Sequence, residues 1–326
     1  DLLIIAPATA NTIAKLAAGL ADNMLTATAL ATEAPILLAP AMESHMWINP
    51  LTQENVDRLR RLRDVTLVGP GEGRLASGAS GSGRMAEPEE ILDAARWVLG
   101  RGGPLAGRRV IITAGGTREP LDPIRYLGNR SSGQMGYALA RAARDRGAQV
   151  TLISTTGRTV PFGAELVSVE TAAEMRDAVL RALPDADALL MAAAVADYRP
   201  TAVAEQKIKK DKEGLALSLV RTPDILAEVA GQRRDDQVVV GFAAETENLV
   251  ENARSKLQRK RLDLIVANDP RQAMGAAANQ VIIIGADGTV TELPLLAKEL
   301  VAHRVMERVV ALFMAMDRGE PASGGG

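Results

Sequence analysis

Short apolar runs alternate with longer stretches of helical periodicity along the chain. The short runs are rich in Val, Ile, Leu and Ala, which is typical of buried strands. Strands that alternate with helices form parallel βαβ units whose helices cover both faces of the sheet. The pattern therefore predicts an α/β fold, with strands at residues 2–6, 35–39, 65–68, 109–113, 149–153, 166–169, 188–192, 238–242, 264–267 and 281–284.

The stretch TAAEMRDAVLRAL illustrates the helical pattern. Thr171 can accept a hydrogen bond from the first turn, and Glu174 stands three residues later, as in a capping box. Met175, Val179 and Leu183 recur at spacings that put them on one helical face. An amphipathic helix is therefore predicted here.

The periodicity breaks at LGRGGPLAGRR, where four glycines and a proline precede a new strand. We therefore predict a linker at residues 99–108 between a first region, 1–98, and a second domain, 109–318. The first region holds three strand candidates, fewer than most sheets have, and it opens directly in an apolar run. We expect it to be the C-terminal part of a larger domain. Residues 319–326 are rich in Gly, Pro and Ser and predict a disordered tail.

Composition excludes several classes of function. Lys and Arg total 38 against 40 Asp and Glu, so no global positive charge attracts nucleic acid or an anionic membrane. No apolar run approaches the roughly 20 residues of a membrane-spanning helix. The chain has no cysteine and two histidines, which removes disulfides and thiolate chemistry and fits a cytoplasmic enzyme. Chemistry is therefore expected from Lys, Arg, Asp and Asn.

Two glycine-containing turns follow predicted strands in the second domain. The turn GGT at 115–117 could expose N–H groups to a phosphate, but a plain tight turn is the more common explanation of these three residues. The stronger signal is SSGQMG, where Ser131 and Ser132 offer caps to a helix whose first turn contains Gly133 and Gly136. Such a helix start binds anions, or packs tightly on a strand.

Polar residues just ahead of that helix favour the anion site. Arg125 supplies a guanidinium and Asn129 an uncharged donor, and both suit a carboxylate or phosphate. Together with Ser131, Ser132 and Gly133 they form the predicted substrate-anion site.

Basic residues follow two further strands. Asp197 comes after an apolar strand, at the edge where open α/β sheets place ligands, although a lone aspartate there is more often a helix cap. Lys207 belongs to a lysine run that could neutralise a polyphosphate beside Asp197, or form a solvated loop. Lys256 and Lys260 are spaced i, i+4, so they could clamp one polyanion or pair with nearby glutamates.

Six segments between residues 113 and 269 occur in an order that resembles the phosphopantothenate-cysteine ligase family: TAGGTREPLDPIRYLGNRSSGQMG, AAAVADYRP, EQKIKK, RTPDIL, VVVGFAAET and LDLIVAND. The resemblance implies a doubly wound, mostly parallel, Rossmann-like sheet. It also implies a reaction in which 4′-phosphopantothenate, CTP and Mg²⁺ give an acyl-cytidylate that L-cysteine converts to an amide. A homodimer through the ligase domain is implied as well, because the segment of Arg125 reaches the neighbouring protomer's site in that family.

The same resemblance implies roles for individual residues. Asn129, Lys207 and Arg125 would be catalytic, with Asn129 hydrogen-bonded to the acyl intermediate. The nucleotide-binding residues would be Met191, Ala192, Ala193, Asp197, Lys207, Thr222, Pro223, Asp224, Ile225, Phe242, Lys256 and Lys260. No metal ligands are implied.

The first region resembles the FMN-dependent phosphopantothenoylcysteine decarboxylase that is commonly fused to this ligase in bacteria. Its PAMESHMW segment has Glu43 where that family has a functional asparagine, and its glycine-rich flap has Ser77 where the family has a redox cysteine. A serine hydroxyl cannot replace a thiol of much lower pKa. We therefore expect a flavoprotein-like α/β remnant without decarboxylase activity, although an intact domain could bind FMN and form a higher oligomer.

Two alternative functions remain open on the sequence. One is an FMN-binding decarboxylase module, and the other is a dinucleotide-binding oxidoreductase that shares only the fold. The oxidoreductase is the weaker, because the complete glycine fingerprint is missing and a fold alone does not establish a function.

Overall fold

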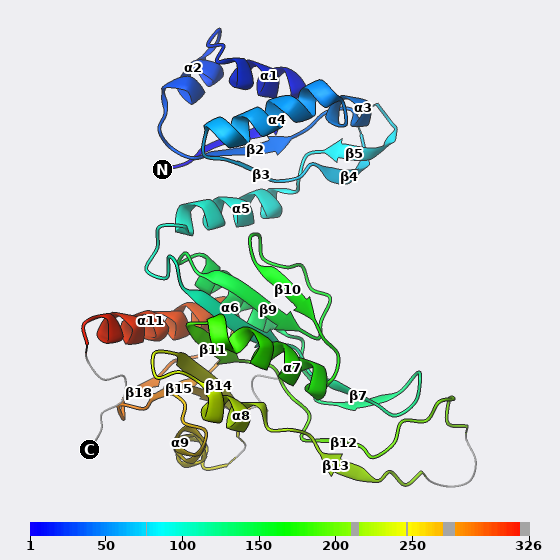
Figure 1. Ribbon diagram of the computed structural model, residues 1–326, viewed down its shortest axis with the longest axis vertical. Helices are drawn as coiled ribbons and strands as arrows, with labels where there is room; N and C mark the ends of the chain where they lie inside the picture. The colour runs from blue at the N-terminus through cyan, green and yellow to red at the C-terminus, as the bar shows by residue number, and fades with distance from the viewer. Residues whose placement is uncertain (76, 210–214, 246, 270–277, 320–326) are drawn as a thin grey trace. The chain divides into compact units, whose positions relative to one another are not determined.

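The computed structural model describes residues 1–75, 77–209, 215–245, 247–269 and 278–319 (Figure 1). The chain divides into two units, residues 1–101 and residues 102–326. Helix α5 (Pro88–Gly100) continues past residue 99, so helical structure extends slightly into the predicted linker. The predicted disordered tail lies outside the described residues from residue 320 onward. No helix in the described part of the chain is long and apolar enough to cross a membrane.

The first unit contains a three-stranded parallel sheet in the order β1-β2-β3. Its apolar core lies between these strands and α1 and α4, where Ile13 and Leu38 are fully buried. A β4–β5 hairpin follows the sheet. The elements are β1 (Leu3–Ala8), α1 (Ala10–Ala18), α2 (Met24–Ala31), β2 (Ile36–Pro40), α3 (Ser44–Trp47), α4 (Pro50–Leu62), β3 (Val65–Leu67), β4 (Gly71–Arg74), β5 (Ser80–Arg84) and α5.

The second unit is built on an eight-stranded sheet in the order β10-β9-β6-β11-β14-β15-β17-β18. The first six strands in this order run parallel, and β17 and β18 complete the sheet antiparallel to their neighbours. This confirms the predicted α/β class and the mostly parallel sheet. The strands are β6 (Arg109–Ala114), β9 (Gln149–Ser154), β10 (Glu165–Ser168), β11 (Ala188–Met191), β14 (Val238–Ala244), β15 (Leu264–Asn268), β17 (Ile282–Gly285) and β18 (Val290–Glu292).

Helices cover both faces of this sheet because alternate residues of each strand point to opposite sides. In β6, Val110 and Ile112 pack on one side, against α6 and α11, whereas Ile111 packs on the other, against α7. The predicted capping box of α7 is present, since Thr171 Oγ1 accepts from Glu174 N. The helices are α6 (Gln134–Arg144), α7 (Ala172–Ala182), η1 (Leu183–Asp185), α8 (Ile225–Gln232), α9 (Leu249–Arg259) and α11 (Lys298–Asp317).

Three small two-stranded sheets stand outside the main sheet and are not predicted by the apolar pattern. The pairs are β7 (Arg118–Pro120) with β8 (Tyr126–Gly128), β12 (Tyr198–Pro200) with β13 (Leu219–Arg221), and β16 (Ala278–Asn279) with β19 (Leu296–Ala297). Figure 1 shows β7, β12 and β13 projecting together from one side of the second unit. We call the described residues 118–128, 198–209 and 215–221 the arm.

Candidate active site

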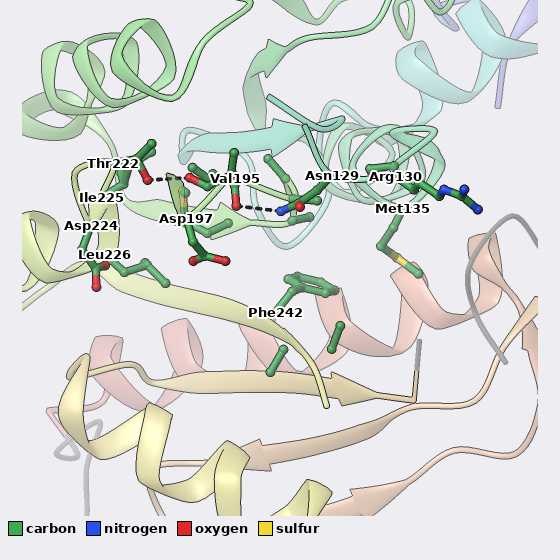
Figure 2. A pocket seen from close by; sticks show the side chains of 18 of the residues that line it. Asn129, Arg130, Met135, Val195, Asp197, Thr222, Asp224, Ile225, Leu226 and Phe242 are labelled. Carbon is green, nitrogen blue, oxygen red and sulfur yellow. Dashed lines mark hydrogen bonds between the residues drawn. The ribbon is translucent and has the colours of Figure 1, made fainter. Parts of the chain in front are cut away.

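A cleft of about 940 Å³ opens in the second unit at the carboxyl ends of β11 and β14. Its walls are the loop that enters α6, the segment that follows β11, the loop that enters α8 and the end of α9. Figure 2 shows Thr222 and Asp224 on one side, Arg130 and Met135 on the other, and Asp197 and Phe242 between them. Side chains from different segments of the second unit therefore face one another across the cleft.

Asn129 connects two walls of this cleft, the loop that enters α6 and the segment that follows β11. Its Nδ2 donates to the carbonyl of Val195 at 3.0 Å, and Figure 2 shows this bond. The turn predicted at 115–117 lies behind them, where Gly116 forms a parallel bridge with Ala194. A Cβ on Gly116 would lie 2.4 Å from the carbonyl oxygen of Asn129, so only glycine fits there. This turn braces the walls and does not line the cleft.

The predicted caps of α6 are wrong, although the predicted residues do line the cleft. The N-cap is Gly133, at a φ of 74°, and no side chain caps the helix. Ser131 Oγ instead accepts from Gly133 N at 3.4 Å. Gly136 is in the first turn, where a Cβ would lie 2.8 Å from the carbonyl oxygen of Thr113. Ser131, Ser132 and Gly133 all line the cleft beside the open start of the helix.

The stretch from Thr222 to Ile225 forms the other wall. Thr222 N donates to the carbonyl of Asp197 at 3.0 Å, and its hydroxyl donates to the carbonyl of Ala196. Asp224 caps α8 by accepting from Ala227 N at 3.2 Å. The Asp197 carboxylate is exposed, and no hydrogen bond to it is recorded within the described part of the chain. It remains available to a ligand.

Two predicted lysines lie at the end of α9, and both line the cleft. Lys256 Nζ donates to the carbonyl of Phe242 at 3.4 Å. Lys260 pairs with Asp224, rather than with a glutamate of its own helix. Burial lowers the pKa of Lys260. The lysines therefore lie between the wall formed by residues 222–225 and the end of β14.

The lining is strongly basic although the whole chain is slightly acidic. Two acidic side chains, Asp197 and Asp224, face this cleft. The basic residues that line it are Arg130, Arg221, Lys256, Arg259, Lys260 and Lys298. Such a local excess of positive charge attracts and holds a polyanion. No group of three or more His, Asp or Glu residues that could hold a metal ion occurs within the described ranges.

Two predicted catalytic residues do not line this cleft. Lys207 was expected in the crevice beside Asp197, but it is an exposed residue of the arm. The Arg125 guanidinium donates to Asp122 Oδ2 at 3.2 Å and to the carbonyl of Ile208 at 3.0 Å. Arg125 therefore connects residues 118–128 of the arm to residues 198–209. Its hydrogen bond to Ile208 holds the loop immediately beside Lys207.

Residues 105–313 match the DNA/pantothenate metabolism flavoprotein C-terminal domain, and residues 1–99 match the flavoprotein family. The chain is 45% identical to the coenzyme A biosynthesis bifunctional protein CoaBC of Mycolicibacterium smegmatis, over 97% of this chain and 81% of that protein. It is 46% identical to CoaBC of Bacillus subtilis, over 96% of this chain and 78% of that protein.

The chain belongs to the family of bifunctional coenzyme A biosynthesis proteins. A crystal structure of the C-terminal domain of a CoaBC protein superposes with a TM-score of 0.56 at 40% identity, covering 64% of this chain and 96% of that domain. The resemblance predicted from the sequence is therefore confirmed, and with it the ligase activity expected of the second unit.

The two positions at which the first unit departs from the decarboxylase pattern are in contact. Ser77 Oγ donates to Glu43 Oε2 at 3.0 Å. The flap is fixed beside them, since Met42 N donates to the carbonyl of Gly83 at 2.9 Å, and a Cβ on Gly83 would lie 2.2 Å from Met42 O. The substitutions therefore share one site of the flavoprotein-like unit.

Sequence reasoning missed several residues of the cleft, including Gln134, Asn268, Asn279 and Lys298. Gln134 directly follows Gly133 of the predicted anion site, so extending that site by one residue would have included it. Asn279 and Lys298 come from the small β16–β19 sheet and from the start of α11. No motif or spacing in the sequence linked these two residues to the glycine-rich helix start.

Asp122 gives a pH-dependent prediction for the arm. Burial opposes ionisation of its carboxyl, but the N–H groups of Ile124, Arg125 and Ile208 outweigh this effect and lower its pKa from 3.8. A lowered pKa stabilises the folded arm above 3.8, and this contribution is lost as the pH falls through the lower value. The amide resonances of these three residues, followed by NMR, are expected to shift together with a midpoint below 3.8. A midpoint at or above 3.8 would contradict the assignment.

Proposed function

We propose that the second unit joins 4′-phosphopantothenate to L-cysteine in this cleft, with CTP as the activating nucleotide. The observation that carries the proposal is the basic, two-sided cleft, in which Asn129 and Val195 separate the Asp197 side from the open start of α6. Ligation of a carboxylate to an amine needs both an activated acyl group and a site for the released polyanion.

In the first step, an oxygen of the substrate carboxylate attacks the α-phosphorus of CTP. The bond to the β-phosphate oxygen breaks, pyrophosphate leaves, and an acyl-cytidylate remains. Lys256 and Lys260 lie where they can neutralise the charge that develops on the leaving group. Lys207 lies outside this cleft in its own chain, and it would add a third cation only if the arm of a second copy delivers it. In the second step, the amine of cysteine attacks the acyl carbon, CMP leaves, and the amine loses a proton as the amide forms.

The remaining predicted residues would position these groups. Residues 191–193 would offer backbone atoms beside the nucleotide, where the side chains of Ala192 and Ala193 are small, and Phe242 would pack against it. Thr222, Pro223, Asp224 and Ile225 form the wall on the nucleotide side. Asn129 would donate to the acyl intermediate in an orientation set by its bond to Val195.

Mg²⁺ fits this site as a partner of the nucleotide. Magnesium usually keeps several waters and takes one or two carboxylates together with substrate phosphates. Asp197 is exposed and Asp224 is engaged by Lys260, so Asp197 is the better-suited carboxylate of the lining. Bound there, the ion would neutralise phosphate charge.

A pyrophosphate-release assay tests the proposal. Wild-type protein with 4′-phosphopantothenate, CTP, Mg²⁺ and cysteine is expected to release pyrophosphate and to form phosphopantothenoylcysteine. Omission of phosphopantothenate or CTP should abolish release, whereas omission of cysteine should leave about one equivalent per site. No release with all four components present would refute the ligase proposal.

We further propose that the arm pairs two copies of the chain and delivers Lys207 and Arg125 to the partner's cleft. The arm exposes apolar side chains, with Ile124 64% and Tyr126 54% exposed, and an exposed cluster of this kind marks an interface. Leu217 and Leu219 add to this surface at 43% and 41%.

A charge placed on this surface tests the dimer. Ile124→Asp is expected to convert a dimer into monomers and to abolish ligase turnover. The dimer interface would bury the new carboxylate without a cationic partner, which is energetically costly. Sedimentation velocity measures the assembly. Leu295→Asp, at a similarly exposed leucine outside the arm, is the matched control and should stay dimeric. A wild-type chain that sediments as a monomer while turning over would contradict the arrangement.

We also propose that the first unit lacks phosphopantothenoylcysteine decarboxylase activity. The Ser77 hydroxyl is held on Glu43 and cannot act as a redox thiol, so these residues do not fit the chemistry that FMN supports in the family. With FMN and phosphopantothenoylcysteine added, carbon dioxide release is expected to stay at background. The same preparation should release pyrophosphate in the ligase assay, which serves as the control. Stoichiometric carbon dioxide would overturn this proposal.

A further inference from the structure

Thr117 is a fully buried polar residue directly behind the cleft. It ends the turn that follows β6, and it is 0% exposed. Its Oγ1 accepts a hydrogen bond from Ala196 N at 2.9 Å, and its own N–H donates to the carbonyl of Ala194 at 3.3 Å. A Cβ on Gly128 would lie 2.5 Å from the Thr117 carbonyl oxygen, so the end of β8 packs closely on this residue. Thr117 therefore contacts two segments of the cleft wall, although it does not line the cleft itself.

The conformation of the segment that follows β11 depends on this hydroxyl. Ala196 is 4% exposed, and its carbonyl accepts a hydrogen bond from the Thr222 hydroxyl. Both backbone polar groups of Ala196 are therefore held by threonine hydroxyls. Without Thr117 Oγ1, the N–H of Ala196 would be a buried donor that lacks its acceptor, which is costly.

The direction of the Asp197 side chain follows from this backbone. Asp197 comes directly after Ala196, and its exposed carboxylate has no hydrogen-bond partner among the described residues. No contact of its own therefore orients the carboxylate. The Asp197 carbonyl accepts from Thr222 N at 3.0 Å, so the backbone of this residue is fixed on both sides. The hydroxyl of Thr117 contributes to this fixation from behind the wall.

The four strands that begin and end the arm leave the second unit around the same point. β7 begins directly after Thr117, and β8 ends directly before Asn129. β12 begins directly after Asp197, and β13 ends directly before Thr222. Thr117, Asn129 and Thr222 all hydrogen-bond to residues 195–197. A displacement of residues 195–197 would therefore reach several walls of the cleft at once.

We propose that Thr117 is a positioning residue of the ligase, and that its hydroxyl acts through Ala196 to direct Asp197 into the cleft. This inference rests on the proposed ligase function and deepens it, because Thr117 would touch neither substrate. A displacement of about 1 Å in a group that positions the reactants can cost about 100-fold in rate. A buried hydroxyl with one backbone contact therefore affects the reaction without supplying a group to the chemistry.

Thr117→Val in the full chain removes the hydroxyl and keeps the shape of the side chain. Single-turnover formation of the acyl-cytidylate at saturating CTP is expected to slow about 10- to 100-fold, the effect of misplacing a group near the reacting atoms. Thr117→Ser keeps the acceptor oxygen and should retain most of the wild-type rate. Thr26→Val is the matched control, because Thr26 is a buried threonine whose hydroxyl accepts from Asn23 N in the first unit. It should form the intermediate at the wild-type rate.

Hydrogen exchange tests the contact independently of turnover. Thr117 Oγ1 protects the Ala196 amide in the wild-type protein, so this amide should exchange faster in Thr117→Val. Thr117→Ser should keep the protection. Wild-type exchange of the Ala196 amide in Thr117→Val would show that the hydroxyl does not hold the segment, and the proposal would be wrong.

A double-mutant cycle distinguishes action through Asp197 from a general loosening of the cleft. Adding Thr117→Val to Asp197→Asn should slow the reaction little beyond Asp197→Asn alone, because residues that act as one unit are not additive. Losses that multiply would show that Thr117 acts independently of Asp197. Equal losses in Thr117→Ser and Thr117→Val would show that packing matters and the hydroxyl does not. Either result overturns the proposal.

The wild-type assay separates this inference from the ligase proposal. If wild-type protein releases no pyrophosphate with all four components, the ligase proposal fails, and the positioning role fails with it. If wild-type protein is active and Thr117→Val forms the acyl-cytidylate at the wild-type rate, only the positioning role fails.

Discussion

Replacing Lys207 by glutamine is expected to lower pyrophosphate release about 100- to 1000-fold, the effect of removing one group that stabilises transition-state charge. Glutamine keeps a polar chain of similar reach but lacks the ammonium that would face the leaving pyrophosphate. The side chain of Lys207 is exposed, so the substitution should leave the fold and the melting temperature unchanged. Single-turnover formation of the acyl-cytidylate, without cysteine, measures the affected step directly.

The matched control for this variant is Lys209→Gln, which removes another exposed lysine two residues away in the same loop. It should retain turnover within a few-fold of wild type. Equal losses in the two variants would indicate a general effect of charge on the arm, and wild-type turnover of Lys207→Gln would remove Lys207 from the mechanism.

Asn129→Asp should have a comparable effect, at about 100- to 1000-fold, for a different reason. The substitution preserves shape but replaces the amide donor by a carboxylate, which would face the carbonyl of Val195 that accepts from it in the wild-type protein. The negative charge of the aspartate would also repel the substrate carboxylate as it approaches the nucleotide. Loss of a donor that acts in the transition state costs several kcal/mol in comparable sites.

Rapid-quench assays of acyl-cytidylate formation test this variant, together with CTP binding by calorimetry. CTP affinity should stay within a few-fold of wild type, because Asn129 lies away from Thr222 and Asp224 in the cleft. Asn252→Asp, an exposed position whose amide donates to the carbonyl of Glu247, is the control for the added charge. If Asn129→Asp formed the acyl-cytidylate at the wild-type rate, Asn129 would have only a structural role in the wall of the cleft.

The arm is the part of the fold that the apolar pattern could not predict. The short strands from Arg118 to Pro120 and from Leu219 to Arg221 carry polar and exposed residues, so they lack the continuous apolar runs of buried parallel strands. They are stabilised by pairing with partners nearby in space and by the Asp122 network. Lys207 consequently belongs to a projecting element, and the sequence alone placed it in the crevice of its own chain.

The sequence by itself determined the α/β class, the strands of the main sheet, the family and many of the residues that line the cleft. It could do so because buried parallel strands are continuously apolar and because the motifs of the family are local in the sequence. Only the tertiary structure decided which charges share a site. Lys260 meets Asp224, Ser77 meets Glu43, and Lys298 meets Gln134 across the fold. Such pairings depend on packing between distant segments, which no local pattern encodes.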